Sequence, residues 1–344
     1  MAPGVRLALA RPSDFWFVRF LEQQTDILAS SFPTLIHRGL TAQMVDGNWL
    51  LVGRTDRAWS GLLAATAVGL YVARSYFTEN VHAESQEPPP IFSNRFGQSL
   101  RLESSELVNH NTKKLRFEFP HAEAKSGLVL TSSVLVVTWP KGKFFPTVRP
   151  YTPVSSLDQR GAIELLVKKY PDGKASSYLH GLSPGDSVYF AGALNGYRWT
   201  PNQFQHITLI AGGAGITPMY QLIRGVLQDP ADKTRITLVF GVNSDADVLF
   251  RQEFEELQRN YGDRFKAVYT VSRPGDHCPF RKGHVTKELI EQASGRAMEG
   301  ERTKVFVCGP PAMESALLGG NSFKSGKRGI LEQLGYTKEQ VHQF

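Results

Sequence analysis

Short segments that alternate hydrophobic and polar residues dominate the middle of the chain. In "KKLRFEF", Leu115, Phe117 and Phe119 fall on one side, as in a strand with one buried face. "AIELLVKKY" and "SVYFAG" continue such short strands between glycine, proline and aspartate turns. The pattern predicts a small antiparallel β-barrel over residues 92–202.

Longer apolar segments alternate with helical patterns in the last part of the chain. "HITLIAGGAGITPMYQLIRGVLQ" passes from a strand pattern through glycines into a helix pattern. The strand patterns "RITLVFGV", "FKAVYTV" and "KVFVCGP" follow, with the helical "FRQEFEELQRNY" after the first of them. Strands that alternate with helices form a doubly wound parallel sheet. We therefore expect a nucleotide-binding domain over residues 203–344, and a two-domain fold of mixed α+β and α/β class.

An uncharged segment near the N-terminus is a candidate membrane anchor. Residues 58–73, "AWSGLLAATAVGLYVA", approach the length of roughly 17–25 residues that a spanning helix needs. The following "SYF" provides aromatic residues of the kind found at membrane interfaces. The polar "TENVHAESQEPPP" comes next and is typical of a stiff spacer. We predict a transmembrane anchor over residues 58–77 and a linker over residues 78–91, with a buried core helix as the alternative.

Residues 1–57 have an unusual charge composition. They contain six arginines and no lysine, which is typical of a mitochondrial presequence. The same segment also contains five acidic residues, which such presequences avoid. We interpret it as a targeting segment without an assigned fold; an incorrect gene model upstream of Met44 is the alternative.

The overall composition narrows the choice of partners. Cys278 and Cys308 are the only cysteines among 344 residues, so the sequence has no disulfide framework. The formal net charge is +7, which suits an acidic protein partner or an anionic membrane. No run of five basic residues occurs, and we therefore expect no nucleic-acid partner.

A glycine loop follows the first strand of the predicted parallel sheet. Gly212, Gly213 and Gly215 lie where that strand gives way to a helix. We expect Thr217 to cap this helix and Pro218 to occupy its first turn. Small residues at this edge let a nucleotide approach the backbone closely. Since the spacing is not G-x-G-x-x-G, a simple tight turn remains the alternative.

"VCGPPAM" repeats this arrangement at the end of a later strand. Cys308 ends the strand, Gly309 turns, and Pro310 with Pro311 prepares a helix. A lone cysteine at a strand end is usually an inert small hydrophobic residue. Because this strand end shares a sheet edge with the glycine loop, we expect a role for Cys308 beside a ligand.

Two further motifs are suited to a flat cofactor that carries a pyrophosphate. In "DGKASSYL", residues 172–179, a helix start could bind phosphate through its free amides; a serine N-cap is the alternative. In "TVRPYTPVSS", residues 147–156, two prolines hold an extended backbone. Arg149 there offers a planar fork for a pyrophosphate, Tyr151 a ring face and Thr152 a hydroxyl. Together with the nucleotide-binding sheet, these motifs indicate two cofactors held edge to edge.

The four motifs resemble those of a known family. "RPYTPVS", "GKASSYL", "GGAGITPM" and "CGPPAM" are similar, in the expected order, to motifs of the NADH–cytochrome b5 reductase branch of the ferredoxin–NADP reductase superfamily. The resemblance covers residues 92–344 and implies FAD and NADH as cofactors. Ala175 and Ala214 depart from the usual methionine and threonine, and neither change removes a phosphate-binding backbone.

The resemblance also implies roles for individual residues. Thr217 would lie against the flavin near the nicotinamide, and Cys308 would help to place the nicotinamide; these two are the predicted catalytic residues. Asp247 matches an acid that accepts the adenosine ribose hydroxyls and so favours NADH over NADPH. The implied cofactor-binding residues are Arg149, Pro150, Tyr151, Thr152, Ser155, Lys168, Tyr170, Gly173, Lys174, Ala175, Ser176, Gly212, Gly213, Gly215, Thr217, Asp247, Cys308, Gly309, Pro310, Met313 and Phe344. No metal site is implied.

The reaction implied by the resemblance is electron transfer from NADH through FAD to cytochrome b5 or a similar acidic haem protein. Hydride would pass to flavin N5, and single electrons would pass on to haem. The alternatives are a related reductase with another haem or iron–sulfur acceptor, and an inactive membrane adaptor with a vestigial flavin fold. The anchor and the "GALNGYRW" segment resemble fungal mitochondrial reductases, which favours the mitochondrial outer membrane. The intermembrane space, after processing, and the endoplasmic reticulum membrane are the alternative locations.

Overall fold

The computed structural model describes residues 41–45, 48–52, 88–93, 97–140, 142, 144–295, 302–319 and 328–344. The chain divides into two compact units, Met1–Gln86 and Glu87–Phe344. In the first unit, β1 (Thr41–Val45) and β2 (Asn48–Val52) form an antiparallel pair. The predicted anchor at residues 58–77 lies outside the described residues. Among the helices that are described, none is long and apolar enough to cross a membrane.

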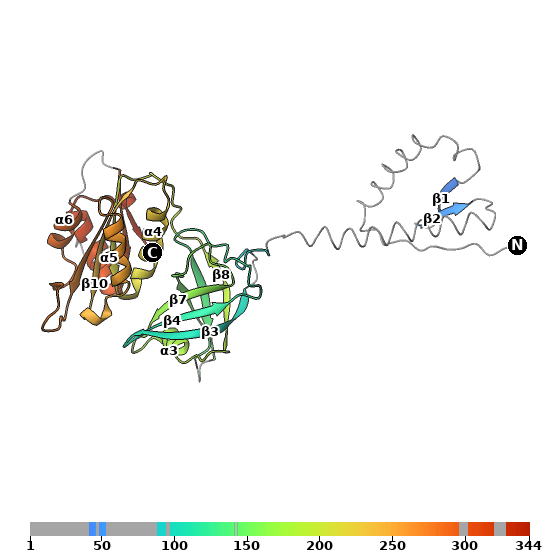
Figure 1. Cartoon of the computed structure of the whole chain (residues 1–344), viewed down its shortest axis with the longest axis horizontal. Helices are drawn as coiled ribbons and strands as arrows, with labels where there is room; N and C mark the ends of the chain where they lie inside the picture. The colour runs from blue at the N-terminus through green and yellow to red at the C-terminus, as the bar shows by residue number, and fades with distance from the viewer. Residues whose placement is uncertain are drawn as a thin grey trace. The chain divides into compact units, whose positions relative to one another are not determined.

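The first sheet of the second unit is antiparallel, with the strand order β6-β5-β8-β3-β4-β7. It is drawn in teal to green in Figure 1. Its strands are β3 (Gln98–Asn109), β4 (Thr112–Glu118), β5 (Ser133–Thr138), β6 (Thr147–Tyr151), β7 (Ala162–Lys168) and β8 (Ser187–Leu194). The predicted alternation in β4 is confirmed, since Leu115 and Phe117 are fully buried and Phe119 is buried just beyond the strand.

One hydrophobic cluster fills the inner face of this sheet. Leu102, Phe117, Val136, Leu165 and Phe190 come from five different strands and all belong to it. Helix α3 (Lys174–His180) adds Leu179 to the same cluster and contacts both end strands, β6 and β7. The helix therefore lies across the two edges of the sheet, next to the strand that carries the "RPYT" motif.

The second sheet is parallel throughout, with the order β12-β11-β10-β9-β13-β14 (Figure 1, yellow to red). Its strands are β9 (His206–Gly212), β10 (Arg235–Val242), β11 (Phe265–Val271), β12 (Arg281–Lys282), β13 (Thr303–Cys308) and β14 (Val341–Gln343). The chain builds outward from β9 in one direction and then resumes at β13 on the other side. Ligands bind in open α/β sheets at the carboxyl ends of the strands where the order reverses in this way.

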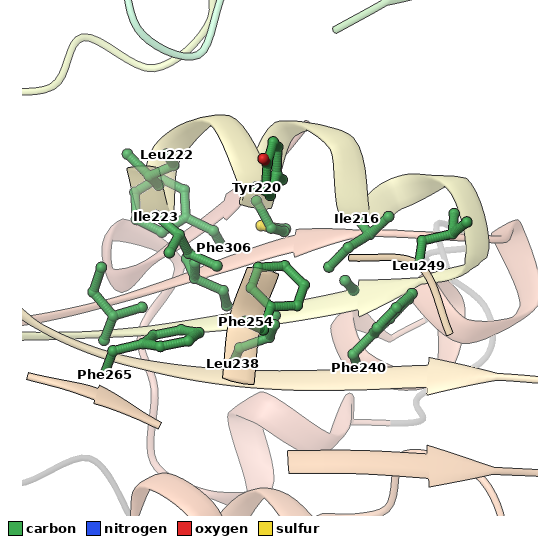
Figure 2. Close-up of a cluster of buried hydrophobic side chains, with 14 of the residues drawn as sticks. Ile216, Tyr220, Leu222, Ile223, Leu238, Phe240, Leu249, Phe254, Phe265 and Phe306 are labelled. Carbon is green, nitrogen blue, oxygen red and sulfur yellow. The ribbon is translucent and has the colours of Figure 1, made fainter. Parts of the chain in front are cut away.

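Helices cover both faces of the parallel sheet. Successive residues of a strand point to opposite faces, so Leu209 and Ile210 of β9 belong to different core clusters. One cluster includes α4 (Ile216–Gln228) and α5 (Arg251–Asn260); in Figure 2 the labelled side chains of α4 lie over Phe240 and Phe306 of the strands. The other cluster includes α6 (Lys287–Ser294), α7 (Pro311–Leu318) and α8 (Ile330–Gln333). The doubly wound arrangement predicted from the sequence is therefore present.

Direct contacts join the antiparallel sheet to helix α4. The Gln221 side chain is buried in α4, and its carbonyl oxygen accepts a 2.6 Å hydrogen bond from the backbone amide of Thr131. Its amide nitrogen donates to the carbonyl oxygen of Pro153 at 3.3 Å. Val154 and Leu166 also pack into the core cluster below α4. The segment that follows the "RPYT" strand is therefore held against the helix that follows the glycine loop.

Candidate functional site

The loops after β9 and β13 pack backbone against backbone at the point where the strand order reverses. A Cβ atom on Gly215 would overlap the carbonyl group of Cys308 and would lie 2.9 Å from the amide nitrogen of Gly309. A Cβ atom on Gly212 would lie 2.7 Å from Cδ of Pro310. Positions 212 and 215 must therefore be glycine, which has no Cβ, for these two loops to be in contact. The structure brings the two predicted nucleotide motifs together at one edge.

The helix after the glycine loop begins differently from the prediction. A short 3-10 turn, η2 (Gly213–Gly215), runs directly into α4, and Gly215 is the residue before the helix. Thr217 is already inside the helix, and its hydroxyl donates to the carbonyl oxygen of Ala214 at 3.2 Å. The prediction that Thr217 caps α4 was therefore wrong, because a capping residue must stand in extended backbone before the first turn. Pro218 lies in the first turn, as expected.

Cys308 ends β13 as predicted and lies in a largely buried position. Burial raises the pKa of its thiol to about 12, and the nearby Glu314 carboxylate acts in the same direction. The thiol therefore stays protonated at neutral pH and is a poor nucleophile. A neutral thiol is compatible with the predicted contact to a ligand and not with covalent chemistry.

Glu314 is a residue that sequence reasoning missed. One of its carboxylate oxygens accepts a 3.0 Å hydrogen bond from the backbone amide of Gly309, and the other accepts one of 2.7 Å from Gln343. It therefore fastens the turn after Cys308 to the C-terminal strand β14. Its place in the first turn of α7 was the available signal, because acids are favoured there. Met313 lies on the same turn, and a Cβ atom on Gly212 would come within 2.9 Å of its sulfur.

Tyr170 reaches from the antiparallel part to the glycine loop. Burial raises the pKa of its hydroxyl, and the neighbouring backbone of Ala214 acts in the opposite direction. A Cβ atom on Gly213 would lie 3.5 Å from the same hydroxyl, and Gly213 itself has φ +51°. The residue is nevertheless 43% exposed, so part of its ring remains open to a ligand.

The start of helix α3 has the features of a phosphate site. Gly173 is the residue before the helix, and the first turn consists of Lys174, Ala175 and Ser176. A Cβ atom on Gly173 would overlap the hydroxyl of Ser176, which donates to the Gly173 carbonyl oxygen at 3.1 Å. The alternative of a serine N-cap was therefore wrong, because Ser176 lies inside the helix. The first amides of a helix have no intrahelical acceptor, and they attract an anion here beside a lysine.

The "RPYT" motif lies on β6, at the edge of the antiparallel sheet. An edge strand tolerates Pro150, which has no amide hydrogen to donate. Arg149 and Tyr151 point to the same side because they are two residues apart in a strand. Arg149 is exposed and donates to the carbonyl oxygen of Val148 at 2.9 Å. Burial raises the pKa of Tyr151 to about 12.

These residues fit FAD. Helix α3 contacts β6, so the strand that carries Arg149 and the helix that begins after Gly173 are neighbours, and both could contribute to one pyrophosphate site. A separate cavity of about 680 Å³ lies along α3; Lys174 lines it, but Arg149, Tyr151 and Gly173 do not. Ser155 differs from the other motif residues: it is buried, and its hydroxyl accepts a hydrogen bond from the Glu164 amide at 3.2 Å.

Asp247 lies after β10 in a 3-10 turn, η3 (Asp245–Asp247), and is only 4% exposed. One of its carboxylate oxygens accepts hydrogen bonds from Lys168 at 2.7 Å and from Asn111 at 3.1 Å. The other accepts two from Ser244, at 2.7 Å from the hydroxyl and 3.1 Å from the amide. Burial acts to raise the pKa of Asp247, but these donors outweigh it and lower the pKa to about 2. The structure therefore pairs the predicted ribose-binding acid with the predicted dinucleotide-binding lysine.

The C-terminal Phe344 lies beside the strand that carries Cys308. Its amide donates to the carbonyl oxygen of Val307 at 3.1 Å, and its ring stacks on Phe306 with centroids 5.8 Å apart. The residue is partly buried against the α4 face of the sheet. Phe344 therefore anchors the C-terminus next to the predicted nicotinamide loop.

Two family models match this chain. The oxidoreductase FAD-binding domain model matches residues 99–199, and the oxidoreductase NAD-binding domain model matches residues 209–318. The first match contains the "RPYT" strand and α3, and the second contains both loops at the carboxyl edge of the parallel sheet.

Curated relatives and a solved structure are also similar over most of the described chain. NADH-cytochrome b5 reductase 2 of Phaeosphaeria nodorum is 46% identical over 251 residues, which are 72% of this chain and 74% of that protein. The protein of the same name from Emericella nidulans is 43% identical over 288 residues, which are 82% of this chain and 88% of that protein. The cytochrome b5 reductase domain of Ulva prolifera nitrate reductase is 29% identical, with a TM-score of 0.64, over 74% of this chain and 100% of that one.

Proposed function

Because this chain belongs to the NADH–cytochrome b5 reductase family, we propose that it is an FAD-dependent oxidoreductase that carries electrons from NADH through FAD to cytochrome b5. The observation that carries this proposal is that the glycine loop after β9, the loop after β13 and the segment after β7 meet at the carboxyl edge of the parallel sheet. Gly215 packs against Cys308, and the hydroxyl of Tyr170, from the antiparallel part, lies beside Gly213 of the glycine loop. A flavin held on β6 and α3 and a nicotinamide held on the two loops would meet there.

Bound FAD supplies the chemistry, since it takes up hydride from a nicotinamide and passes electrons on singly. The chain itself provides binding and orientation. Arg149 and the start of α3 hold the pyrophosphate, and Tyr151 supports the ring system. Gly212 and Gly215 allow the dinucleotide to approach the backbone at the strand ends.

Thr217 lies just after the glycine loop and Cys308 lies just before the loop after β13, where these two loops are in contact. Thr217 is buried, and its hydroxyl is held by the Ala214 carbonyl oxygen. Cys308 presents a neutral thiol, which neither attacks the ring nor adds a negative charge beside it. Both residues orient the nicotinamide, and neither needs to change its protonation state.

We assign the preference for NADH over NADPH to Asp247. With its pKa held at about 2, its carboxylate is charged at every physiological pH. A charged carboxylate accepts hydrogen bonds from the ribose hydroxyls of NADH and repels the 2′-phosphate of NADPH.

The test uses the purified full chain in detergent. A yellow protein whose flavin absorbance is bleached by NADH, much faster than by NADPH, and which then reduces cytochrome b5 supports the proposal. A folded but colourless protein contradicts it and favours the inactive adaptor. Bleaching by NADH without reduction of cytochrome b5, but with reduction of an iron–sulfur acceptor, favours the related reductase.

We also propose a single-pass anchor at residues 58–77 and residence in the mitochondrial outer membrane. The support is the uncharged segment 58–73, the proline-ended spacer after it and the arginine-rich, lysine-free segment before it. The test is fractionation of cells that express the full chain, followed by carbonate extraction. Recovery in the carbonate-resistant outer-membrane fraction, and release when residues 58–77 are deleted, are the expected results. Recovery in the endoplasmic reticulum contradicts the location, and carbonate-soluble full chain contradicts the anchor.

A further inference from the structure

The turn between β3 and β4 reaches from the antiparallel part to the parallel part of the second unit. Asn109 donates a 3.0 Å hydrogen bond to the carbonyl oxygen of Ala246, and Asn111 donates one of 3.1 Å to the carboxylate of Asp247. The oxygen of the Asn111 amide is also engaged, since the buried Thr112 hydroxyl donates to it at 2.9 Å. The Asn111 oxygen therefore faces Thr112, and its NH₂ group faces both Asp247 and the ring nitrogen of His110, which lies 2.8 Å away.

The four donors on Asp247 occupy its hydrogen-bonding capacity. A carboxylate has about four lone-pair sites, and Lys168, Asn111 and the two groups of Ser244 engage all of them. The carboxylate is also 4% exposed, so a ligand reaches it only by displacing a group that covers it. A ribose hydroxyl that binds Asp247 must therefore replace one of these donors.

The donors differ in how easily they can be replaced. Ser244 belongs to the same short turn as Asp247 and closes a capping box with it, so its bonds move with the carboxylate. Lys168 makes a charge-assisted bond with a side chain only 10% exposed, and displacing it would leave the buried carboxylate charge without its counter-ion. Asn111 is a neutral donor at 3.1 Å, on a turn whose neighbour His110 is 56% exposed at its side chain. Of the three residues, Asn111 is the donor whose displacement from Asp247 costs the least free energy.

We propose that Asn111 occupies, in the unliganded protein, the hydrogen-bonding position that the adenosine ribose of the dinucleotide takes on Asp247. The inference rests on the proposed function, because it assumes that Asp247 binds the ribose. Asn111 is a positioning residue in this scheme. Its amide hydrogen-bonds the Asp247 carboxylate and holds the orientation of that carboxylate until a ribose hydroxyl replaces the amide. Because the amide must first be displaced, the affinity is lowered for every ligand that binds Asp247.

The experiment measures binding of NAD⁺ and NADP⁺ to the oxidised, flavin-loaded full chain by calorimetry. In Asn111→Ala one acceptor site on Asp247 is already free, so NAD⁺ should bind about two- to fivefold more tightly, as expected for one net hydrogen bond. The affinity for NADP⁺ should not change, because its 2′-phosphate is still repelled by the charged carboxylate of Asp247. Gln221→Leu is the control, since it removes bonds between the same two parts without touching Asp247 or Asn111. Asn109 is unsuitable for this purpose, because its side-chain oxygen accepts the backbone amide of Asn111 at 3.1 Å.

Each outcome decides. Tighter NAD⁺ binding in Asn111→Ala, with NADP⁺ binding unchanged and Gln221→Leu like the parent, supports the inference. Equal gains in affinity for both nucleotides, or a gain in Gln221→Leu as well, overturn it, because they indicate a general loosening between the two parts. Unchanged or weaker NAD⁺ binding in Asn111→Ala also overturns it, while the proposed function stands if the parent protein binds NAD⁺. A parent protein that binds no NAD⁺ overturns the proposed function and this inference together.

Discussion

Gly215 packs directly against the carbonyl group of Cys308, so closely that a Cβ atom on Gly215 would overlap it. The two residues are far apart in the sequence, but β9 and β13 are neighbours in the parallel sheet, and each residue lies at or just after the end of its strand. This contact fixes the spacing of the two loops that form the predicted nicotinamide site.

Gly215→Ala should weaken nucleotide binding and lower stability. The added Cβ would meet backbone, which cannot rotate away, so the two loops must separate at a cost of about 1–3 kcal/mol. Calorimetric titration with NAD⁺ and urea unfolding measure the two effects. The control is Gly275→Ala, where the new Cβ makes only an ordinary contact of 3.5 Å with Asp245. Similar losses in both variants would contradict the argument from backbone packing.

Arg149→Ala should lose flavin during purification. The variant removes the planar fork predicted to bind the pyrophosphate, and a charged hydrogen bond contributes about 1.5–3 kcal/mol. Flavin absorbance per mole of protein is the measurement. Arg149→Lys should retain an intermediate amount, because an ammonium keeps the charge but not the bidentate geometry. Arg259→Ala, an exposed site on α5, is the control. Flavin content in Arg149→Ala equal to that of the control would show that Arg149 does not hold the pyrophosphate.

Gln221→Leu should destabilise the contact between α4 and the antiparallel sheet. The variant leaves the buried amide of Thr131 without its acceptor, which costs about 1–3 kcal/mol. Urea unfolding, followed by tryptophan fluorescence, measures the loss. Gln228→Leu changes an exposed glutamine on the same helix and should be nearly neutral. If both variants unfold at the same urea concentration, Gln221 does not join the two parts.

His206 should make stability depend on pH. Burial, followed by the charge of Arg235, lowers the pKa of His206 to about 4. The folded protein therefore binds fewer protons at this site than the unfolded chain, whose histidine has a pKa of about 6.5. Lowering the pH from about 6.5 to about 4 should then reduce the free energy of unfolding through this group.

The measurement is urea unfolding of the parent and of His206→Gln between pH 7 and pH 4. The glutamine does not titrate, so the variant should show a smaller loss of stability over this range. His277→Gln, at an exposed histidine, should keep the slope of the parent. An unchanged slope in His206→Gln would show that another group sets the pH dependence.

Local patterns predicted the elements of the fold because each depends on neighbouring residues. The alternation of Leu115 and Phe117 identified a half-buried strand, and the change to continuous apolar segments identified the parallel sheet. Cys308 was correctly placed at a strand end. The same local reasoning placed the start of α3 correctly, and only the alternative of a serine N-cap was wrong there, because Gly173 is the residue before the helix. It failed at α4, where Gly215 precedes the helix and Thr217 lies inside the first turn. Those positions depend on backbone angles that the residue types did not reveal.

The sequence by itself determined the two kinds of sheet, the order of the motifs and the family, since periodicity and short motifs are properties of consecutive residues. Only the tertiary structure decided which distant groups meet. Asn111 and Lys168 on Asp247, Gln343 on Glu314, and Thr131 on Gln221 are hydrogen bonds between segments that no local pattern connects. A polar side chain looks the same in the sequence whether it faces water or a partner. Burial distinguishes the two cases, because a buried polar group must find a hydrogen-bond partner and the fold determines which one is in reach.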